Sequence, residues 1–377
     1  MLNYEYPPLG GGASPVTKSL SEELVKLGHN VDVVSMGFKG LKEKEQINGV
    51  TVYRVPSIRK ELSVCQTHEM FTYCYSAYRF LPKLLKEKKY DINHSHFIIP
   101  TAIVSYLRRS EIPYIITSHG SDVPNYNPDR FGMQHKLLKP LWNRIVENAE
   151  YITSPTEYLK NLILENLNKE NNNIEIKVIP NGITLEDFNP KKKEKKILVV
   201  TRLFERKGVQ YVIDAMKDIK DYELVICGNG PYKEKLEQQI RNLNVKNIHL
   251  LGYVSSERLK NEYETSSIFV LTSSAENFPV VLLEAMASGC AIITSNATGC
   301  PEVVGDTALL VKPQSSEDIR KNLFKLINDP ELLNELMVKA RKRVEENFTW
   351  KKIAQKYIKT YEQVILKEKS VLEGINK

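Results

Sequence analysis

Two glutamates, Glu276 and Glu284, lie eight positions apart in the segment SSAENFPVVLLEAMASGC, residues 273–290. Glu284 stands inside an otherwise apolar run, and burial of a carboxylate is costly unless a strong partner satisfies it. A carboxylate can accept two hydrogen bonds at once from neighbouring hydroxyls of a sugar or a ribose. The alternative is that Glu284 pairs with a buried arginine and that Glu276 is a solvated residue at a helix start.

Pro279 suits the first turn of a helix that contains Glu284. The backbone amides of Asn277, Phe278 and Val280 then lie at or just before a helix N-terminus, which attracts anions. Two carboxylates around an anion site suit a ligand with a phosphate and hydroxyl-rich rings on both sides. This chemistry is that of a nucleotide sugar.

A second group of residues lies in TRLFERKG, residues 201–208, directly after an apolar strand pattern. Arg202 and Lys207 follow the carboxyl end of that strand, where open α/β sheets bind ligands. Arg as a bidentate partner and Lys as a point charge could hold a diphosphate. The alternative is an ordinary solvated loop.

Two glycine-rich turns each separate a strand pattern from a helix pattern. PPLGGGASP, residues 7–15, contains Gly11 and Gly12, and CGNGPYKEK, residues 227–235, contains Gly230. Without side chains these positions let the backbone approach a phosphate. Neither turn has the spacing of a Walker A or dinucleotide-binding loop, so each alone could be a plain turn.

These residues must be positioned by alternating strands and helices. Short β-branched runs are predicted as strands at 31–36, 50–55, 91–96, 114–118, 151–154, 176–180, 196–203, 222–228, 247–254, 267–273, 290–295 and 308–312. Near-continuous apolar strands separated by amphipathic helices indicate parallel sheets covered on both faces. The polar, charged run around Pro190 predicts a boundary, giving domains 1–189 and 190–348 and a C-terminal helix in 349–377. Only MLNYEY is available for the first strand, which raises the expectation that Met1 is internal to a longer chain.

Composition excludes several classes of function. The net charge of +7 is mild, and no basic stripe interleaved with aromatic residues is present, so we expect no nucleic-acid partner. The five cysteines are irregularly spaced, which is typical of reduced, intracellular proteins. No apolar run is long enough to span a membrane. We therefore expect a cytoplasmic protein, or one at the cytoplasmic face of a membrane.

Two further features allow more than one interpretation. His94 and His96 share one face of a strand and could form a metal pair, line the acceptor side of a cleft, or simply pack. Segment 59–89 is rich in aromatic residues and ends in lysines. It could contact a membrane or a lipid-linked acceptor, or form a core helix with a solvated basic end.

Together the motifs resemble the retaining nucleotide-sugar glycosyltransferases of the glycogen-synthase-like "glycosyl transferases group 1" family, family four of the glycosyltransferase classification. The resemblance covers nearly the whole chain. Glu276 and Glu284 match the family's E-x7-E motif, and Arg202 and Lys207 match its cation pair. Gly11 and Gly12 match its N-terminal glycine loop. HGSD, residues 119–122, and VIPNGI, residues 178–183, resemble two further family segments.

The resemblance implies an α/β protein of the GT-B fold, with two Rossmann-like doubly wound domains facing across a cleft. Domain 1–189 would bind the acceptor, domain 190–348 would bind the nucleotide sugar, and the helix in 349–377 would cross back to the N-terminal domain. The resemblance also implies that Arg202 and Lys207 neutralise the leaving diphosphate and that Glu284 binds the ribose. Glu276 and His119 would meet the transferred sugar. The remaining implied donor contacts are Gly11, Gly12, Gly230, the backbone of Val254 near the base, and Asn277, Phe278, Pro279 and Val280. Acceptor-side contacts would be His94, His96 and Asp122.

The expected function is retaining transfer of a hexose-type sugar from a UDP-, GDP- or ADP-sugar to a hydroxyl acceptor of glycan, glycolipid or polysaccharide synthesis. The acceptor could be lipid-linked, with weak peripheral membrane contact. No Asp-x-Asp motif occurs, so no metal or other cofactor is expected. The alternatives are a sugar phosphorylase or nucleotide-sugar epimerase on the same fold, and a non-catalytic nucleotide-sugar-binding protein.

Overall fold

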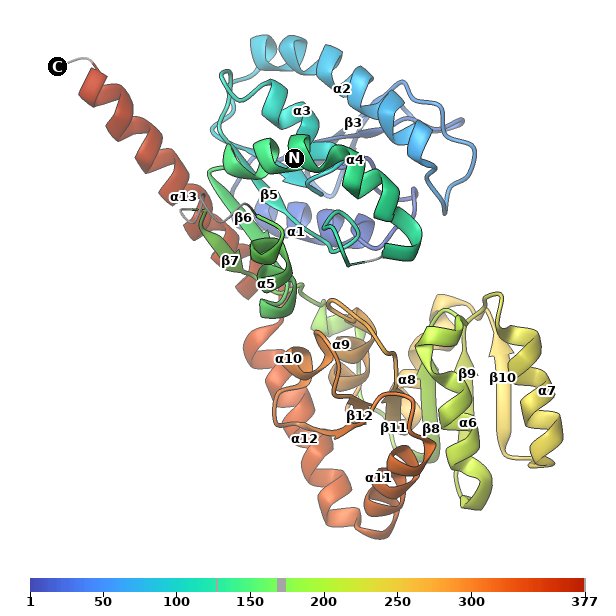
Figure 1. The fold of residues 1–377 in the computed structure, drawn as a ribbon. Coiled ribbons are helices and arrows are strands. Elements are labelled where there is room, and N and C mark those ends of the chain that lie inside the picture. Colours follow the sequence, from blue (N-terminus) through green and yellow to red (C-terminus); the bar gives the residue numbers. More distant parts are fainter. Residues whose placement is uncertain (127, 168–173, 376–377) are drawn as a thin grey trace. The chain divides into compact units, whose positions relative to one another are not determined.

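The computed structural model describes residues 1–126, 128–167 and 174–375 (Figure 1). The chain forms two compact α/β units. The N-terminal unit comprises Met1–Pro180 together with Trp350–Lys377, and the C-terminal unit comprises Asn181–Thr349. The passage between the units comes earlier than the boundary predicted after residue 189, because the amide of Ile183 already bonds the Phe348 carbonyl within the C-terminal unit.

The C-terminal unit contains a six-stranded parallel sheet in the order β10-β9-β8-β11-β12-β13. Its strands are β8 (Glu194–Val200), β9 (Glu223–Cys227), β10 (Ile248–Gly252), β11 (Ser266–Leu271), β12 (Ala291–Ser295) and β13 (Ala308–Val311). All six were predicted from sequence. The strand order reverses between β8 and β11, and ligands bind at such a switch point in doubly wound sheets.

Helices cover both faces of this sheet. They are α6 (Val209–Ala215), α7 (Lys233–Leu243), α8 (Ser256–Thr265), α9 (Val280–Ala287), α10 (Cys300–Val304), α11 (Ser316–Asn328) and α12 (Pro330–Asn347). Ile197 and Leu198 are neighbours on β8 and enter different hydrophobic cores, one on each face. Because both faces are buried, this central strand is a continuous apolar run.

The N-terminal unit has a second, mostly parallel sheet in two sections. The orders are β2-β3-β1 and β4-β5-β6-β7. The strands are β1 (Asp32–Met36), β2 (Lys44–Ile47), β3 (Val50–Val55), β4 (Asn93–His96), β5 (Tyr114–Thr117), β6 (Tyr151–Ser154) and β7 (Ile176–Val178). Leu2 forms parallel bridges to Val34 and Ser95 and so joins β1 to β4. The predicted first strand is therefore central, but it is reduced to this single bridging residue.

The described part of this unit also contains the helices α1 (Ser14–Lys26), α2 (Thr67–Glu87), α3 (Thr101–Leu107), α4 (Pro128–Glu147), α5 (Glu157–Glu165) and α13 (Trp350–Ile375). Helix α13 packs beside α1, with Trp350 and Tyr357 in the same core as Leu20. The C-terminal helix thus belongs to the N-terminal unit.

The antiparallel strand β2 was not predicted. It pairs with β3 through a tight turn in which Asn48 and Gly49 both have positive φ, 48° and 86°. An Asn-Gly pair with this geometry is the typical two-residue hairpin turn. The strand itself, KEQI, is polar and lies at the sheet edge, so it lacks the apolar pattern of the others.

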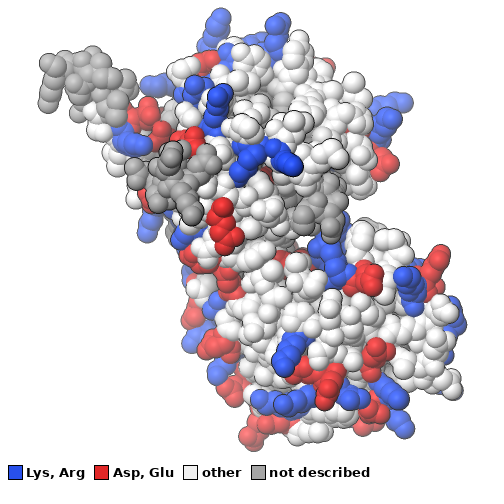
Figure 2. Space-filling model, in the orientation of Figure 1, with Lys and Arg blue, Asp and Glu red and all other residues white. Residues whose placement is uncertain are grey.

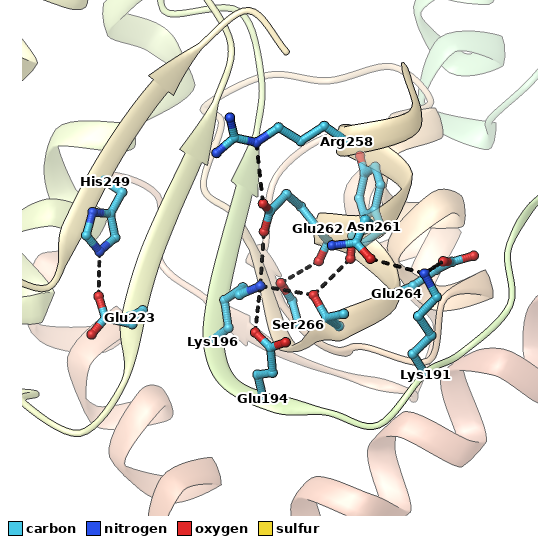
Figure 3. Close-up of polar contacts among 12 residues, drawn as sticks. Lys191, Glu194, Lys196, Glu223, His249, Arg258, Asn261, Glu262, Glu264 and Ser266 are labelled. Atoms are coloured by element: carbon cyan, nitrogen blue, oxygen red, sulfur yellow. Dashed lines mark hydrogen bonds and ion pairs between the residues drawn. The ribbon is translucent and has the colours of Figure 1, made fainter. Parts of the chain in front are cut away.

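The basic run KKKEKK, part of the charged segment predicted as a domain boundary, is bound to the C-terminal part of α8 (Figure 3). Lys191 forms an ion pair of 2.9 Å with Glu264, and Lys196 one of 3.1 Å with Glu262. Lys193 donates to the carbonyls of Glu264 and Ser288 at 3.0 and 2.7 Å.

On the face shown in Figure 2, basic and acidic side chains are interspersed over the C-terminal unit. Within the described residues, no helix is long and apolar enough to cross a membrane.

Candidate active site

The loops that follow β8 and β11 meet at the switch point of the C-terminal sheet. Lys207, from the β8 loop, is buried and forms a short hydrogen-bonded ion pair with Glu276, from the β11 loop. A cation predicted for the diphosphate and a carboxylate predicted for the sugar are thus brought together. Glu276 is therefore not merely a solvated residue.

Gly208 allows these loops to approach closely. Its φ is 72°, and a Cβ atom there would lie 2.4 Å from the Thr272 carbonyl oxygen. The Thr272 hydroxyl donates back to the Gly208 carbonyl at 3.1 Å, and the Ser274 amide donates to the Arg206 carbonyl at 2.9 Å. Any other residue at position 208 would push the loops apart and displace Lys207.

The backbone of Glu276 is fixed by the loop after β12. The Glu276 amide donates to the Thr298 hydroxyl at 2.8 Å, and that hydroxyl donates to the Glu276 carbonyl at 2.6 Å. The Gly299 amide donates to the same carbonyl at 2.9 Å. The carboxylate is left to face Lys207.

Glu284 lies on α9 and its carboxylate accepts a hydrogen bond from the Tyr263 hydroxyl at 2.8 Å. Among the described residues no lysine or arginine pairs with it, so the alternative of a buried arginine partner is wrong. Burial raises the pKa of Glu284 and the Tyr263 bond opposes that rise. One neutral phenol leaves most of the acceptor capacity of a carboxylate unused.

Helix α9 begins at Val280, with Pro279 at the N-cap position, one residue before the predicted first turn. Asn277 and Pro279 are buried, whereas Phe278 is partly exposed and packs on Phe348 with 5.9 Å between ring centroids. The helix N-terminus thus lies between the two glutamates in sequence. This is the arrangement predicted for an anion flanked by hydroxyl-bearing rings.

Arg202 also follows β8, but its side chain is exposed. Its guanidinium lies 5.6 Å from the centre of the Phe204 ring. No carboxylate among the described residues pairs with it, so the positive charge remains available for a ligand.

Gly230 and Val254 follow β9 and β10 at the same carboxyl edge of the sheet. A Cβ atom at Gly230 would lie 2.4 Å from the Leu203 carbonyl oxygen, so the glycine permits contact with the β8 loop. Val254 is half-buried beside the core beneath α9. The structure therefore places Arg202, Gly230, Val254 and Glu276 after four strands that end at one edge.

In the N-terminal unit the glycine turn follows the short first strand. Gly11 has φ 145°, and a Cβ there would lie 1.6 Å from a carboxylate oxygen of Glu5. Gly12 has open space at its Cβ position. Buried Arg59 donates to the Gly10 carbonyl at 3.2 Å and lies 3.9 Å from the Glu5 carboxylate. These two contacts of Arg59 hold the glycine turn in place.

The histidines at the ends of β4 and β5 form a contact series. His96 Nδ1 lies 3.1 Å from His119 Nε2, and His119 is partly exposed. His94 is buried, with its Nδ1 2.8 Å from the Tyr361 hydroxyl and its Nε2 2.7 Å from the Thr117 hydroxyl. With both ring nitrogens bonded, His94 fits the packing interpretation. The described residues contain no cluster of three side chains able to hold a metal ion.

Asp122 is buried and its carboxylate is surrounded by donors. Oδ1 accepts from the Ser118 hydroxyl and from the amides of His119 and Gly120 at 2.9–3.1 Å, and Oδ2 accepts from the Ile98 amide at 2.8 Å. Desolvation raises its pKa against these bonds. These bonds hold the turn that carries His119, and the acceptor-side role of Asp122 stays a prediction.

Sequence reasoning missed Tyr263, Thr298 and Arg59. Tyr263 lies in the polar helix α8, and nothing in its neighbourhood indicates a contact twenty-one positions along the chain. Thr298 has a positive φ of 49°, a local property that its sequence does not signal. Arg59 was noted only as part of a segment rich in aromatic residues.

Two family patterns match adjacent parts of this chain. Residues 10–187 match Glycosyltransferase Family 4, and residues 183–343 match Glycosyl transferases group 1. An uncharacterized glycosyltransferase of Methanocaldococcus jannaschii is 29% identical over 388 residues, covering 96% of this chain and 97% of the relative. The N-acetyl-alpha-D-glucosaminyl L-malate synthase of Bacillus anthracis is 25% identical over 395 residues, covering 97% of each chain.

Solved structures share the fold. Sucrose-phosphate synthase from Thermosynechococcus elongatus superposes with a TM-score of 0.78 at 21% identity, over 94% of each chain. Anabaena HepE in complex with UDP gives a TM-score of 0.76 at 17% identity, over 96% of this chain and 98% of that one. With its two Rossmann-like sheets, the chain therefore has the GT-B fold.

Proposed function

Because the chain belongs to the glycosyl transferases group 1 family, we propose that it transfers a hexose-type sugar, with retention, from a nucleoside diphosphate sugar to a hydroxyl acceptor. The observation that carries the proposal is the half-buried carboxylate of Glu284, whose one hydrogen bond among the described residues comes from Tyr263. A ribose diol supplies two donors and satisfies that carboxylate without a protein cation.

Each residue at the switch point then has a role in the reaction. Arg202 and Lys207 stabilise the negative charge that develops on the leaving diphosphate, which is usually the largest catalytic contribution. Glu276 holds hydroxyls of the transferred sugar once the diphosphate competes for Lys207. Outside the switch point, His119 of the N-terminal unit has the proposed role of binding an oxygen of the transferred sugar.

The bond changes in this reaction are balanced within the donor and acceptor. The bond from the anomeric carbon to the diphosphate oxygen breaks, and a bond from that carbon to the acceptor oxygen forms on the same face. The acceptor's proton moves to a phosphate oxygen of the leaving group. We assign no metal to this reaction, because Arg202 and Lys207 supply the positive charge that a metal would otherwise bring.

The donor and the acceptor are proposed from the relatives. The Bacillus anthracis relative is named for N-acetylglucosaminyl transfer, and HepE binds UDP. UDP-N-acetylhexosamine is therefore the first donor to test, followed by UDP-glucose and the GDP- and ADP-sugars. Acceptors in glycan, glycolipid or polysaccharide synthesis all present the required hydroxyl, and we place the reaction in the cytoplasm.

A lipid-linked acceptor is proposed from the surface near the glycine turn. The Gly10 amide bonds the Leu62 carbonyl at 2.7 Å, and several apolar side chains of this region are exposed. They are Ile58, Leu62, Val64, Phe71 and Tyr75. Tyr73 of α2 is instead buried, so the helix has both a core face and an exposed aromatic face. Co-sedimentation with anionic liposomes at low salt tests this membrane contact. Absence of binding would contradict the proposed contact.

Thermal shift with UDP, GDP, ADP and their hexose and N-acetylhexosamine conjugates, each with and without EDTA, tests the whole proposal. A ligand present at 100 times its Kd adds about 2.7 kcal/mol of stability. We expect one nucleotide family to stabilise the protein equally with and without EDTA. No shift with any nucleotide would mean that Glu284 is not a ribose ligand, and a shift abolished by EDTA would mean that a metal holds the diphosphate. Donor cleavage that requires inorganic phosphate would indicate the phosphorylase.

A further inference from the structure

A stack of histidine rings runs through the N-terminal unit to His119. His94 and His96 lie on the same face of β4, and their ring centroids are 4.5 Å apart. His96 and His119 are also stacked, at 5.3 Å with 14° between ring planes. The His96 side chain is fully buried, whereas His119 is partly exposed at the end of β5.

The hydrogen bonding of the two β4 histidines differs. Both ring nitrogens of His94 have hydroxyl partners. His96 bonds His119 through Nδ1, but its Nε2 is buried and has no partner among the described residues. A buried polar atom left unpaired costs about 1–3 kcal/mol. An apolar ring would fill this position at no such cost, so packing does not explain the imidazole.

The unpaired nitrogen decides where the protons lie. Burial lowers the pKa of His96 well below its ordinary value and that of His119 to about 3, so both rings are neutral and carry one N–H each. A proton on His96 Nε2 would be a buried N–H without an acceptor, which is rare in proteins. A proton on His96 Nδ1 instead points at His119 Nε2.

We propose that His96 is a positioning residue that donates from Nδ1 to Nε2 of His119 and so places the His119 proton on Nδ1. His119 then offers an N–H donor to an oxygen of the transferred sugar, a last step that rests on the proposed function. The ring is held on one side by His96 and also contacts Phe97, with 4.8 Å between centroids. The donor is therefore fixed in both direction and protonation before the sugar arrives.

The substitution His96→Phe tests this role, with His94→Phe as the matched control. A phenyl ring at position 96 keeps the ring stack. It removes the hydrogen bond from His96 Nδ1 to His119 and the unpaired Nε2 nitrogen. We expect His96→Phe to leave the Tm unchanged or raised. His94→Phe should lower the Tm, because it removes two hydrogen bonds and leaves the Tyr361 hydroxyl without its imidazole partner, while Thr117 keeps its bonds to Thr153 and Tyr357.

The direct readout is the ¹⁵N spectrum of histidine-labelled protein, which distinguishes protonated from unprotonated ring nitrogens. Wild-type His119 should be protonated at Nδ1, and His96→Phe should redistribute that proton over both nitrogens. The affinity for UDP should not change, whereas the affinity for UDP-N-acetylglucosamine should fall by up to about 10-fold, the range for one neutral hydrogen bond.

His119 protonated at Nε2 in the wild type would overturn the proposal. So would an unchanged His119 spectrum in His96→Phe, or a loss of Tm as large as that of the control. Should His96→Phe fail to fold, the wild-type spectrum and His96→Asn still decide the proton's position. Wild-type protein that binds neither nucleotide would count against the proposed function, while the spectrum alone would still decide the role of His96.

Discussion

A half-buried carboxylate with a single neutral partner is stabilised poorly in the free protein. Glu284 is held by Tyr263, and its pKa is raised by burial. Glu276, in contrast, is held by Lys207 across the switch point. At the scale of the residue, the two glutamates therefore differ in their surroundings. In the proposed reaction, Glu284 would accept hydrogen bonds from hydroxyl groups of the ligand, and Glu276 would exchange Lys207 for the transferred sugar.

The substitution Glu284→Gln should separate binding from stability. Glutamine can still accept from Tyr263 but no longer buries a charge, so the free energy of unfolding at pH 7 should stay constant or rise. The affinity for UDP should fall by about 10-fold or more, since hydrogen bonds to a charged group contribute about 1.5–3 kcal/mol. Calorimetric titration and urea unfolding measure both quantities, with exposed Glu257→Gln as the control. Unchanged UDP affinity would remove Glu284 from the donor site.

The substitution Lys207→Ala should lower kcat by about 100-fold or more, because it removes a fixed charge beside the leaving group. Release of nucleoside diphosphate from the donor measures the rate. Lys217→Ala, an exposed lysine of the same unit, should leave the rate unchanged. A Lys207→Ala rate within about threefold of wild type would contradict the leaving-group role.

At the scale of the element, α8 is anchored by its last turn. Glu264 is 2% exposed, accepts from the Asn189 amide at 2.9 Å and pairs with Lys191. Desolvation acts to raise the pKa of Glu264, but the Asn189 amide and Lys191 outweigh it, and the pKa is lowered. A lowered carboxylate pKa adds stability above the unfolded pKa of about 4.5, and this stability is lost as the pH falls below it.

Glu264→Gln should therefore lower the free energy of unfolding by about 1–3 kcal/mol at pH 7. The difference from wild type should shrink as the pH falls below 4.5. Urea unfolding at several pH values measures this, with Glu257→Gln on the exposed face of the same helix as control. A pH-independent difference would show that the ion pair and amide bond do not account for the anchoring.

The helices and strands were largely predictable, because buried parallel strands have nearly continuous apolar sequences. β8 and its neighbours follow directly from this pattern, and the loops after them locate Arg202, Lys207 and Glu276. The polar edge strand β2 lacks the pattern, although Asn48-Gly49 marks its turn. Partners such as Tyr263 and Thr298 depend on how distant elements pack, which spacing along the chain does not encode.

At the scale of the whole molecule, the two units differ in their buried titratable groups. Six of the seven histidines belong to the N-terminal unit, and His249 belongs to the C-terminal unit. His94 and His96 are buried with pKa values far below the ordinary range, and that of His119 is lowered to about 3, in each case chiefly by desolvation. His249 in the C-terminal unit is exposed and pairs with Glu223.

Acidification should therefore destabilise the N-terminal unit first. Between pH 6.5 and the lowered folded-state values, the unfolded chain binds protons that the folded chain does not, so stability falls with pH. For each of the buried rings His94 and His96, the free energy of unfolding falls by about 1.4 kcal/mol for every pH unit of acidification in this range. Asp122, whose pKa is raised, acts in the opposite direction, but only as the pH approaches the range in which carboxylates titrate.

Amide hydrogen exchange at pH 7.5 and 5.5, corrected for the intrinsic exchange rates, measures both units in one sample. Protection of β4 and β5 should drop while that of β8 and β11, the internal control, changes little, and His94→Asn should reduce the drop. Equal loss in both units would mean that general charge repulsion, and not the buried imidazoles, sets the acid sensitivity of the protein.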